Sequence, residues 1–219
     1  MENLQRFLFS LLLLVVWGCA NNTQRQDEEI PLPYYNSADF TPIWLDKADN
    51  GINELHTIQE FSLLNQNGEL VSNESLAGKI YVADFFFTIC PSICPKMTSN
   101  LARVQKEFED DKEIQLISFS VMPWVDSVSV LKNYAEVHQI NDQQWNLLTG
   151  DTEQIYRLAR QSFFAEKEIG LNRSTDEFLH TENFILVDGK GHIRGVYNGT
   201  IGLEMVRLTE DIRTLKAKG

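Results

Sequence analysis

The sequence predicts an α/β domain whose mixed β-sheet is covered by helices on both faces. Segments typical of strands alternate with segments typical of helices through most of the chain. The run 79–87 is almost continuously apolar, as in a strand that is buried on both faces. Two last strand segments are joined by a short turn and followed by one helix. Alternation favours parallel strands and the short turn adds an antiparallel pair, so the sheet is expected to be mixed.

Each element follows from periodicity and from residues that begin or end helices and strands. The expected strands are 57–64, 79–87, 114–121, 145–148, 183–187 and 192–197. Asn65 to Gly68 ends the first strand, and Asp188 to Gly191 is a hairpin turn. The expected helices are 95–108, 127–137, one that ends at Ala159, and 203–215. Asp126 or Ser127 caps the second helix, and Asp151 or Thr152 caps the third.

Composition indicates one exported domain rather than a nucleic-acid-binding protein. The chain has 219 residues, of which 43% are hydrophobic and 23% charged, enough to bury a sizeable core. Its net charge of −12 would repel a phosphate backbone and anionic lipid headgroups. We therefore expect no nucleic-acid partner and no membrane attachment through a basic patch.

The N-terminus resembles an export signal. Arg6 precedes an apolar run, Phe7 to Trp17, which is too short to span a bilayer because a spanning helix needs about 20 residues. Gly18 and Cys19 follow, and this arrangement resembles a bacterial lipoprotein box, although Trp17 stands where a small residue is usual. The resemblance implies cleavage before Cys19 and lipidation of that cysteine; the alternative is a plain secretory signal with an incidental cysteine.

These features divide the chain into three parts. Residues 1–18 are the expected lipoprotein signal peptide, 19–50 a polar, acidic tether and N-terminal extension, and 51–219 the domain. Two or more acyl chains anchor a protein stably. We therefore expect a domain on the extracytoplasmic side of the bacterial cell envelope, anchored to a membrane by the lipid on Cys19.

Cys90 and Cys94 carry the chemistry of the domain. The chain has three cysteines, so assigning Cys19 to lipid leaves only this pair, at the junction of an apolar strand and a helix. Residues four apart on a helix share a face, with Cα atoms about 6 Å apart, a separation that a disulfide accepts. A bridge across so short a loop would stabilise the fold little, so the pair is expected to be reactive. Reduced, the two thiolates would suit a soft metal, but they need a third ligand.

His180 is the histidine best placed to be that ligand. His138 ends a helix, His192 follows a hairpin turn and His56 is ambiguous. A cysteine pair between a central strand and a helix matches the thioredoxin-like arrangement, in which the loop before the penultimate strand crosses close to the cysteine helix. His180 lies in that loop, where redox enzymes of this fold usually carry a cis-proline, and no proline follows Pro123.

The chain resembles the Sco/SenC family, thioredoxin-fold proteins implicated in copper delivery to cytochrome c oxidase. The resemblance runs from about His56 to Ile212. Its motifs are the cysteine segment 85–95, Ser120-Val-Met-Pro-Trp-Val-Asp-Ser127, Trp145-Asn-Leu-Leu-Thr-Gly150 and the histidine loop before 184–189. It implies copper, as Cu(I) or Cu(II), bound by Cys90, Cys94 and His180.

The family pattern also bears on three nearby residues. Where the family commonly shows D-P-x-x-D-T, this chain keeps the second acid as Asp126 and has Met122 in place of the first. Asp126 either tunes the site or caps a helix, and Met122 is an extra soft ligand or a core residue. Asp84 interrupts the apolar strand 79–87, where a carboxylate is costly unless it is paired. It either assists proton transfer to a thiol or meets a lysine or a backbone donor.

The resemblance favours a non-enzymatic metallochaperone that passes copper to the CuA site of an oxidase subunit. It also implies as partners a periplasmic thiol reductant or a copper donor. The alternative is a thiol–disulfide oxidoreductase that keeps CuA or other exported cysteines reduced, since exchange needs only Cys90 and Cys94. A third possibility is a lipid-anchored thioredoxin-fold protein that binds no metal.

Overall fold

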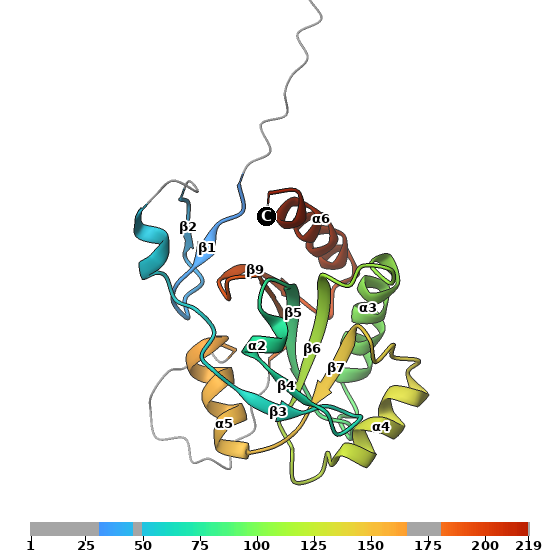
Figure 1. Cartoon of the computed structure of the whole chain (residues 1–219). Coiled ribbons are helices and arrows are strands. Elements are labelled where there is room, and N and C mark those ends of the chain that lie inside the picture. The colour runs from blue at the N-terminus through green and yellow to red at the C-terminus, as the bar shows by residue number, and fades with distance from the viewer. Residues whose placement is uncertain (1–30, 46–49, 166–180, 219) are drawn as a thin grey trace, which may run out of the picture. The chain divides into compact units, whose positions relative to one another are not determined.

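A seven-stranded mixed sheet organises the fold (Figure 1). The computed structural model describes residues 31–45, 50–165 and 181–218. The strand order is β2-β1-β9-β8-β5-β6-β7. The strands are β1 (Tyr34–Tyr35), β2 (Pro42–Ile43), β5 (Ile80–Phe86), β6 (Ile114–Ser120), β7 (Trp145–Leu148), β8 (Asn183–Val187) and β9 (Ile193–Asn198). Strands β5, β6 and β7 are parallel to one another, and the pairings of β8, β9, β1 and β2 are antiparallel.

The two central strands are buried on both faces, as their apolar sequences predict. Every residue of β6 is buried, and β5 is buried from Tyr81 to Phe86. Successive side chains of a strand point to opposite faces. Tyr81 and Phe85 accordingly join one core cluster, whereas Val82 and Phe86 join the other.

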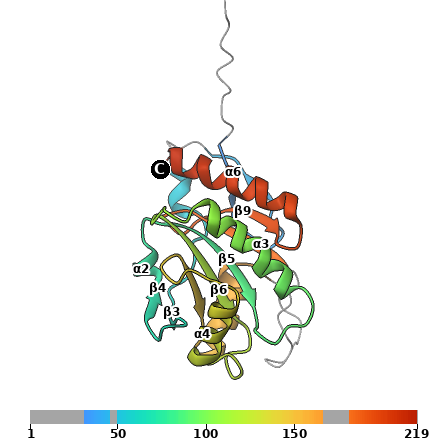
Figure 2. The ribbon, with the colours of Figure 1, turned by 90° about the vertical axis from the view of Figure 1, so that its right-hand side faces the viewer.

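Helices cover both faces of the sheet, which confirms the predicted fold class. On one face lie α3 (Cys94–Glu107), α4 (Val128–Val137) and α6 (Gly202–Lys218), with α3 and α6 side by side (Figures 1 and 2). On the other lie α5 (Thr152–Arg157), the π-helix η3 (Leu158–Ser162), the hairpin β3 (Ser62–Leu64) and β4 (Leu70–Ser72), and α2 (Asn73–Leu76). A 3-10 helix, η2 (Asn50–Glu54), precedes the hairpin.

Side chains that the sequence marked as caps begin two helices. Ser127 Oγ accepts a hydrogen bond from the backbone nitrogen of Val130 at 3.4 Å and begins α4. Asp151 Oδ1 accepts one from Gln154 at 2.8 Å and begins α5. For each helix the sequence left two candidate caps, and the structure selects one.

Three differences from the expected elements have local causes. The first strand is shorter than 57–64 because the backbone nitrogens of Ile58 and Phe61 bond to Gly191 and to the Asn73 side chain, outside any strand. The strand β4 and helix α2 follow the first turn and were not expected. The helix expected to end at Ala159 continues as the π-helix η3, one turn beyond α5.

Part of the segment expected to be a tether and extension adds two strands to the sheet. Tyr35 pairs with Ile193, so β1 covers the edge of β9. The Arg194 guanidinium lies 3.8 Å above the Tyr34 ring, and its Nε donates to the carbonyl of Pro33 at 3.0 Å. The expected signal peptide 1–18 and Cys19 lie outside the described residues. None of the helices in the described part of the chain is long and apolar enough to cross a membrane.

Candidate metal centre

The cysteine pair lies where the central strand passes into the first long helix. β5 ends at Phe86 and α3 begins at Cys94, with Cys90 in the loop between them. Both thiols are free. Both residues are buried: Cys90 is 9% exposed and Cys94 is 3% exposed. The predicted strand-to-helix position is therefore correct.

The expectation that both cysteines share one helix face is wrong, because α3 begins only at Cys94. Pro91 follows Cys90, and a residue before proline is driven away from helical geometry. Pro95, at the second helical position, lacks an N–H that the first turn would leave unpaired. The two prolines thus place Cys90 in the loop and let the helix begin at Cys94.

Cys90 is the more acidic thiol. Burial opposes its ionisation, but hydrogen bonds outweigh burial and lower its pKa. They come from the Cys94 thiol and from the backbone N–H groups of Ser92, Ile93 and Cys94. These N–H groups point outward at the start of a helix, where they stabilise a thiolate.

Cys94 is the more basic thiol. Burial raises its pKa to about 12, and its hydrogen bond to Cys90 and the nearby charge of Asp84 act in the same direction. The backbone N–H of Phe87 opposes this shift without overcoming it. Cys90 is therefore the thiol that ionises first as pH rises, and Cys94 keeps its proton longer.

Asp126 fastens the cysteine loop to the end of β6. Its carboxylate is fully buried and accepts hydrogen bonds from the backbone nitrogen of Thr88 at 3.2 Å and from the Thr88 hydroxyl. It also accepts one from Ser120 Oγ at 2.5 Å. Of the two roles the sequence left open, helix capping belongs to Ser127, and Asp126 instead supports the loop two residues before Cys90.

Asp84 is a buried acid on the same face of β5 as α3. Asp84 is 4% exposed. Ser118, which is paired with Asp84 on the neighbouring strand β6, donates a hydrogen bond to Oδ1. Trp145 Nε1 in turn donates to Ser118 Oγ at 2.8 Å. Burial raises the pKa of Asp84 to about 7, against the lowering effect of the Ser118 hydrogen bond. Within the described residues, its hydrogen-bond partner is the Ser118 hydroxyl and neither a lysine nor a backbone donor.

Three histidines lie in the described residues, and each is engaged elsewhere. His56 Nε2 lies 2.7 Å from the carbonyl oxygen of Ser162, and His192 Nδ1 lies 3.3 Å from Asp188 Oδ1. The His138 ring packs on Tyr134, with centroids 4.1 Å apart. His180, the expected third ligand, lies outside the described residues. Within the residues that are described, no three His, Cys, Asp or Glu side chains group closely enough to hold a metal ion.

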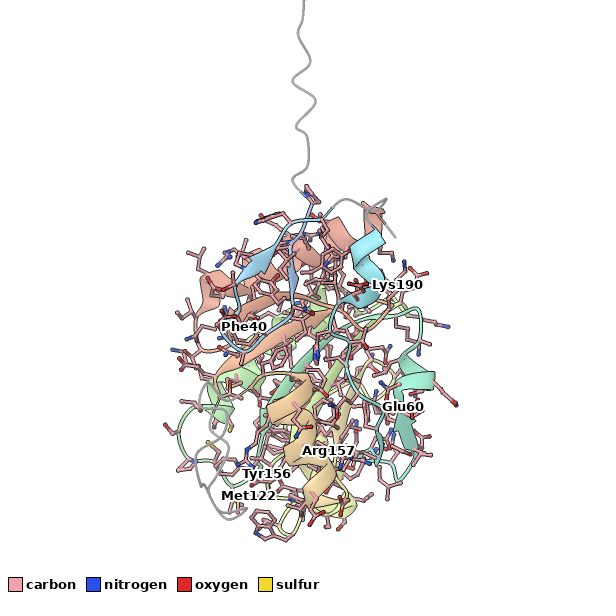
Figure 3. The ribbon with its side chains drawn as sticks, turned by 90° about the vertical axis from the view of Figure 1, so that its left-hand side faces the viewer. Phe40, Glu60, Met122, Tyr156, Arg157 and Lys190 are labelled. Atoms are coloured by element: carbon pink, nitrogen blue, oxygen red, sulfur yellow. The ribbon has the colours of Figure 1, made fainter. Side chains whose placement is uncertain are left out.

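Met97 and Met122 are both buried. Met97 is 1% exposed and belongs to the core cluster that contains both cysteines, as its place on the apolar helix face predicts. Met122 is 8% exposed and follows Val121, whose carbonyl accepts a hydrogen bond of 3.0 Å from the Tyr156 hydroxyl (both Met122 and Tyr156 are labelled in Figure 3).

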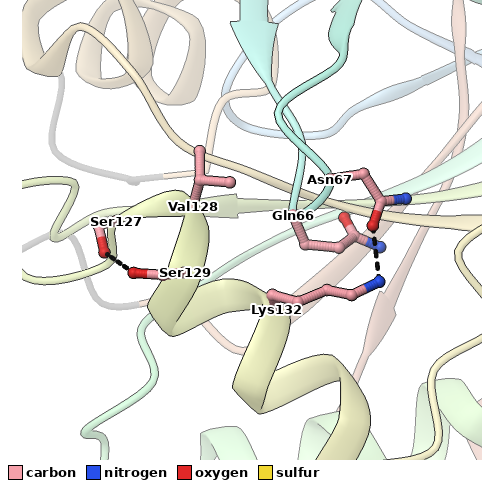
Figure 4. A pocket seen from close by; sticks show the side chains of 6 residues that line it. All are labelled: Gln66, Asn67, Ser127, Val128, Ser129 and Lys132. Atoms are coloured by element: carbon pink, nitrogen blue, oxygen red, sulfur yellow. Dashed lines mark hydrogen bonds between the residues drawn. The ribbon is translucent and has the colours of Figure 1, made fainter.

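A surface hollow at the start of α4 is a separate feature. It is lined by Gln66, Asn67, Ser127, Val128, Ser129 and Lys132 (Figure 4). Lys132 Nζ donates to Asn67 Oδ1 at 2.7 Å, and the hydroxyls of Ser127 and Ser129 are 3.1 Å apart. Neither cysteine lines this hollow, and the Gln66 amide on its wall is bonded to the backbone of Trp145 and Leu147.

Comparison with known proteins places the chain in a family. The family model SCO1/SenC matches residues 50–216, more than half of the chain. The chain belongs to the SCO1/SenC family. The resemblance seen in the cysteine and histidine motifs is thereby confirmed.

Solved structures of SCO1/SenC proteins resemble the chain over most of their length. A SCO1/SenC family lipoprotein from Bacillus anthracis is 31% identical, with a TM-score of 0.64 over 74% of this chain and 95% of that one. BsSco, a Sco cytochrome c oxidase assembly protein with a disulfide switch, is 32% identical, with a TM-score of 0.64 over 75% and 95%. Bradyrhizobium japonicum ScoI with copper bound is 25% identical, with a TM-score of 0.55 over 73% and 99%. These likenesses confirm the thioredoxin-like fold.

The donor atoms in the described part of the site suit a soft metal. Two reduced sulfurs lie within hydrogen-bonding reach of each other, and hydrogen bonds lower the pKa of one of them, Cys90. Soft thiolates select Cu(I), zinc or iron–sulfur centres over hard cations. Sequence reasoning found both sulfurs and Asp126, but it missed Thr88 and Ser118, the hydroxyl donors to Asp126 and Asp84. Only the pairing of β5 with β6 and the folding of the loop onto Asp126 bring these donors into place.

Proposed function

We propose that this SCO1/SenC protein is a copper metallochaperone that holds copper through Cys90, Cys94 and His180. The observation that carries the proposal is the pair of free, adjacent thiols at the start of α3. A third ligand from the loop that carries His180 would complete a set of two sulfurs and one imidazole nitrogen. Copper bound to the related ScoI protein supports this choice of metal.

We further propose that the copper is delivered to the CuA site of cytochrome c oxidase during its assembly. BsSco belongs to a family of cytochrome c oxidase assembly proteins, which supports an oxidase subunit as the acceptor. Delivery by ligand exchange requires that the acceptor reach the metal. Cys90, in the loop and more exposed than Cys94, is the thiol from which an acceptor cysteine would first take copper.

The asymmetry of the thiols favours a second function, thiol–disulfide exchange. Cys90, with its lowered pKa, would attack a partner's disulfide, and Cys94 would resolve the mixed disulfide. The disulfide switch of BsSco supports such chemistry. In this function the protein would reduce the CuA cysteines or other exported thiols.

The proposed location is the extracytoplasmic side of the bacterial cell envelope. Cys19 would carry the lipid, residues 1–18 would be removed as the signal peptide, and the polar residues after Cys19 would connect lipid and domain. The description of the Bacillus anthracis relative as a lipoprotein supports this arrangement. Radiolabelled palmitate should label the wild type but not Cys19→Ser, and equal labelling of the two would refute lipidation at Cys19.

A transfer assay separates the two functions. The copper-loaded protein is mixed with a reduced, copper-free CuA domain, and the purple CuA absorption is followed. The chaperone function predicts CuA formation with the wild type and its loss in Cys90→Ser. The reductase function predicts that the reduced, copper-free protein restores free thiols to an oxidised CuA domain. If neither CuA formation nor thiol recovery occurs, both functions are refuted.

A further inference from the structure

Large apolar side chains are exposed at the edge of the sheet where the cysteines lie. Ile89, directly before Cys90, is 60% exposed, and Trp124, in the loop after β6, is 59% exposed. Contiguous apolar patches mark surfaces that bind another molecule, whereas isolated apolar residues are common on any surface. The arrangement of these residues therefore decides whether they form a binding surface.

The loops that carry Ile89 and Trp124 are joined to each other. β5 and β6 are parallel neighbours, so the loops after them leave the sheet at the same edge. Thr88, the residue before Ile89, donates to the Asp126 carboxylate from its backbone nitrogen at 3.2 Å and from its hydroxyl. Trp124 lies two residues before Asp126, in a turn closed by a hydrogen bond of 2.9 Å from the Asp126 nitrogen to the Met122 carbonyl.

The turn from β9 into α6 reaches the same edge on the other side of β5. β9 is antiparallel to β8, which is antiparallel to β5, so β9 ends where β5 ends. Asn100 on α3 donates to the carbonyl of Gly199 at 2.8 Å, which holds this turn beside the cysteine helix (Figure 2). Two more large apolar side chains, Ile201 and Leu203, are exposed here. We call the four exposed side chains along this edge the apolar rim: Ile89, Trp124, Ile201 and Leu203.

The segments that carry the apolar rim are uncharged, although 23% of the chain is charged and its net charge is −12. No Asp, Glu, Lys or Arg occurs in these three segments, 87–95, 121–125 and 199–203. Beyond them, Asp126 is buried, Glu204 is paired with Arg207 at 2.8 Å, and Lys96 is exposed. Few charges and exposed aromatic groups are typical of the centre of a protein–protein interface. A partner would therefore meet this edge through apolar contact.

We propose that the apolar rim is the surface on which the copper acceptor docks, and that the acceptor presents an apolar, uncharged surface around its own thiols. Ile89 directly precedes Cys90, so a protein whose sulfur reaches Cys90 must also cover Ile89. Other occupants of an apolar surface, such as a lipid bilayer, have no need to reach the Cys90 sulfur. The inference deepens the proposed function and rests on it, because it needs an acceptor that takes copper at Cys90.

Transfer kinetics test the inference. The full chain carrying Cys19→Ser is loaded with copper(I) and mixed with increasing concentrations of a reduced, copper-free CuA domain. The initial rate at which copper leaves the chain, measured by rapid separation and metal analysis, gives a half-saturating concentration and a maximal rate. Trp124→Ala should raise the half-saturating concentration by about tenfold, because tryptophans in an interface often dominate its binding energy. The maximal rate and the copper affinity should equal those of the parent, since Trp124 has no donor atom for copper.

Trp44→Ala is the matched control. Trp44 is 57% exposed, almost as much as Trp124, but it follows β2, which β1 connects to the start of β9 at Ile193, away from the cysteine edge. This variant should keep the half-saturating concentration of the parent. Equal half-saturating concentrations in Trp124→Ala and Trp44→Ala overturn the inference and leave the proposed function standing. If the parent transfers no copper, the proposed function fails, and the inference fails with it.

The salt dependence of the parent covers the case in which Trp124→Ala does not fold. Salt screens contacts between charged surfaces but not apolar contacts. Raising sodium chloride from about 50 to about 500 mM should therefore change the half-saturating concentration by less than about threefold. A larger rise would show that charges guide docking and would overturn the inference. Binding to phosphatidylcholine vesicles that Trp124→Ala abolishes, with copper transfer unchanged, would assign the apolar rim to a membrane and overturn it as well.

Discussion

Thr88 and Asp126 are joined by two hydrogen bonds, one from the Thr88 backbone nitrogen at 3.2 Å and one from its hydroxyl. They hold the start of the cysteine loop against the end of β6, where Ser120 donates to the same carboxylate. The position of Cys90 therefore depends on a residue 36 positions later in the sequence.

Replacing Asp126 should weaken both the fold and the metal site. Asp126→Ala leaves the partly buried Thr88 donors and the buried Ser120 hydroxyl unpaired, which should cost about 1–3 kcal/mol in the free energy of unfolding. Copper affinity should fall by about 10- to 100-fold, as when groups that orient metal ligands are removed. Urea unfolding and chelator competition measure the two effects. Asp110→Ala, at an exposed position, is the control. Equal copper affinity in Asp126→Ala and wild type would contradict the role of Asp126 in positioning the cysteine loop.

The two thiols should differ in reactivity. Because the pKa of Cys90 is lowered and that of Cys94 is raised to about 12, iodoacetamide should modify Cys90 first at neutral pH. The rate at Cys90 should level off below the ordinary thiol pKa, whereas the rate at Cys94 should keep rising into the alkaline range. Mass spectrometry of peptides from the reduced protein gives both rates. Equal rates at neutral pH would show that the asymmetry is absent.

Asp84 should make stability fall as pH rises. Its pKa in the folded protein, about 7, exceeds the ordinary value of 3.8, so the folded state keeps a proton that the unfolded state has lost between these values. The stability of the reduced protein should therefore decrease from about pH 4 to pH 7 through this group, and level off above.

Asp84→Asn isolates this contribution, because asparagine cannot ionise. Relative to wild type, its free energy of unfolding should rise as pH increases from about 5 to 8. Urea unfolding at both pH values measures the change, and the exposed Asp110→Asn serves as the comparison. A constant difference between Asp84→Asn and wild type across this range would contradict the raised pKa of Asp84.

Arg194 should hold the N-terminal extension, residues 31–45, against the sheet. Besides lying over Tyr34, its guanidinium pairs with Asp188 at 3.1 Å and donates to the carbonyl of Leu32 at 2.6 Å. Arg194→Ala leaves the partly buried Asp188 without this partner and should cost about 1–3 kcal/mol in the free energy of unfolding. Proteolysis within 31–45 should also become faster. Lys190→Ala, at the exposed turn nearby (Figure 3), should change neither stability nor proteolysis. Unaltered proteolysis of Arg194→Ala would refute the role of Arg194 in holding the N-terminal extension.

The central strands, helix starts and hairpin turn could be predicted because the residues that determine them lie close together in the sequence. The apolar run around β5, the capping residues Ser127 and Asp151, and the Asp188 to Gly191 turn each act within a few residues. The short strands β1 and β2 are held instead by pairing with distant β9 and by Arg194. A two-residue strand has no periodicity to detect, so these elements could not be predicted.

In the candidate metal centre, too, contacts between residues far apart in the sequence could not be predicted. The cysteines stood out by type and spacing, but the part played by the carboxylates depends on residues far apart in the chain. Ser118 meets Asp84 only through the register of β5 and β6, and Thr88 meets Asp126 only when the loop folds back. The expected helix start at residue 95 was within one residue of the observed start at Cys94, but the expectation that Cys90 shares its helix face overlooked Pro91.

Copper(I) binding to the reduced protein tests the central claim most directly. Stoichiometry and affinity are measured by chelator competition in Cys19→Ser, alone and combined with Cys90→Ala, Cys94→Ala or His180→Ala, with His138→Ala as the matched control. The three-ligand site predicts one copper per chain in the parent and in His138→Ala, with binding lost or sharply weakened in each of the other three. Unchanged affinity in His180→Ala would contradict the site, and unchanged affinity in either cysteine variant would contradict the copper function altogether.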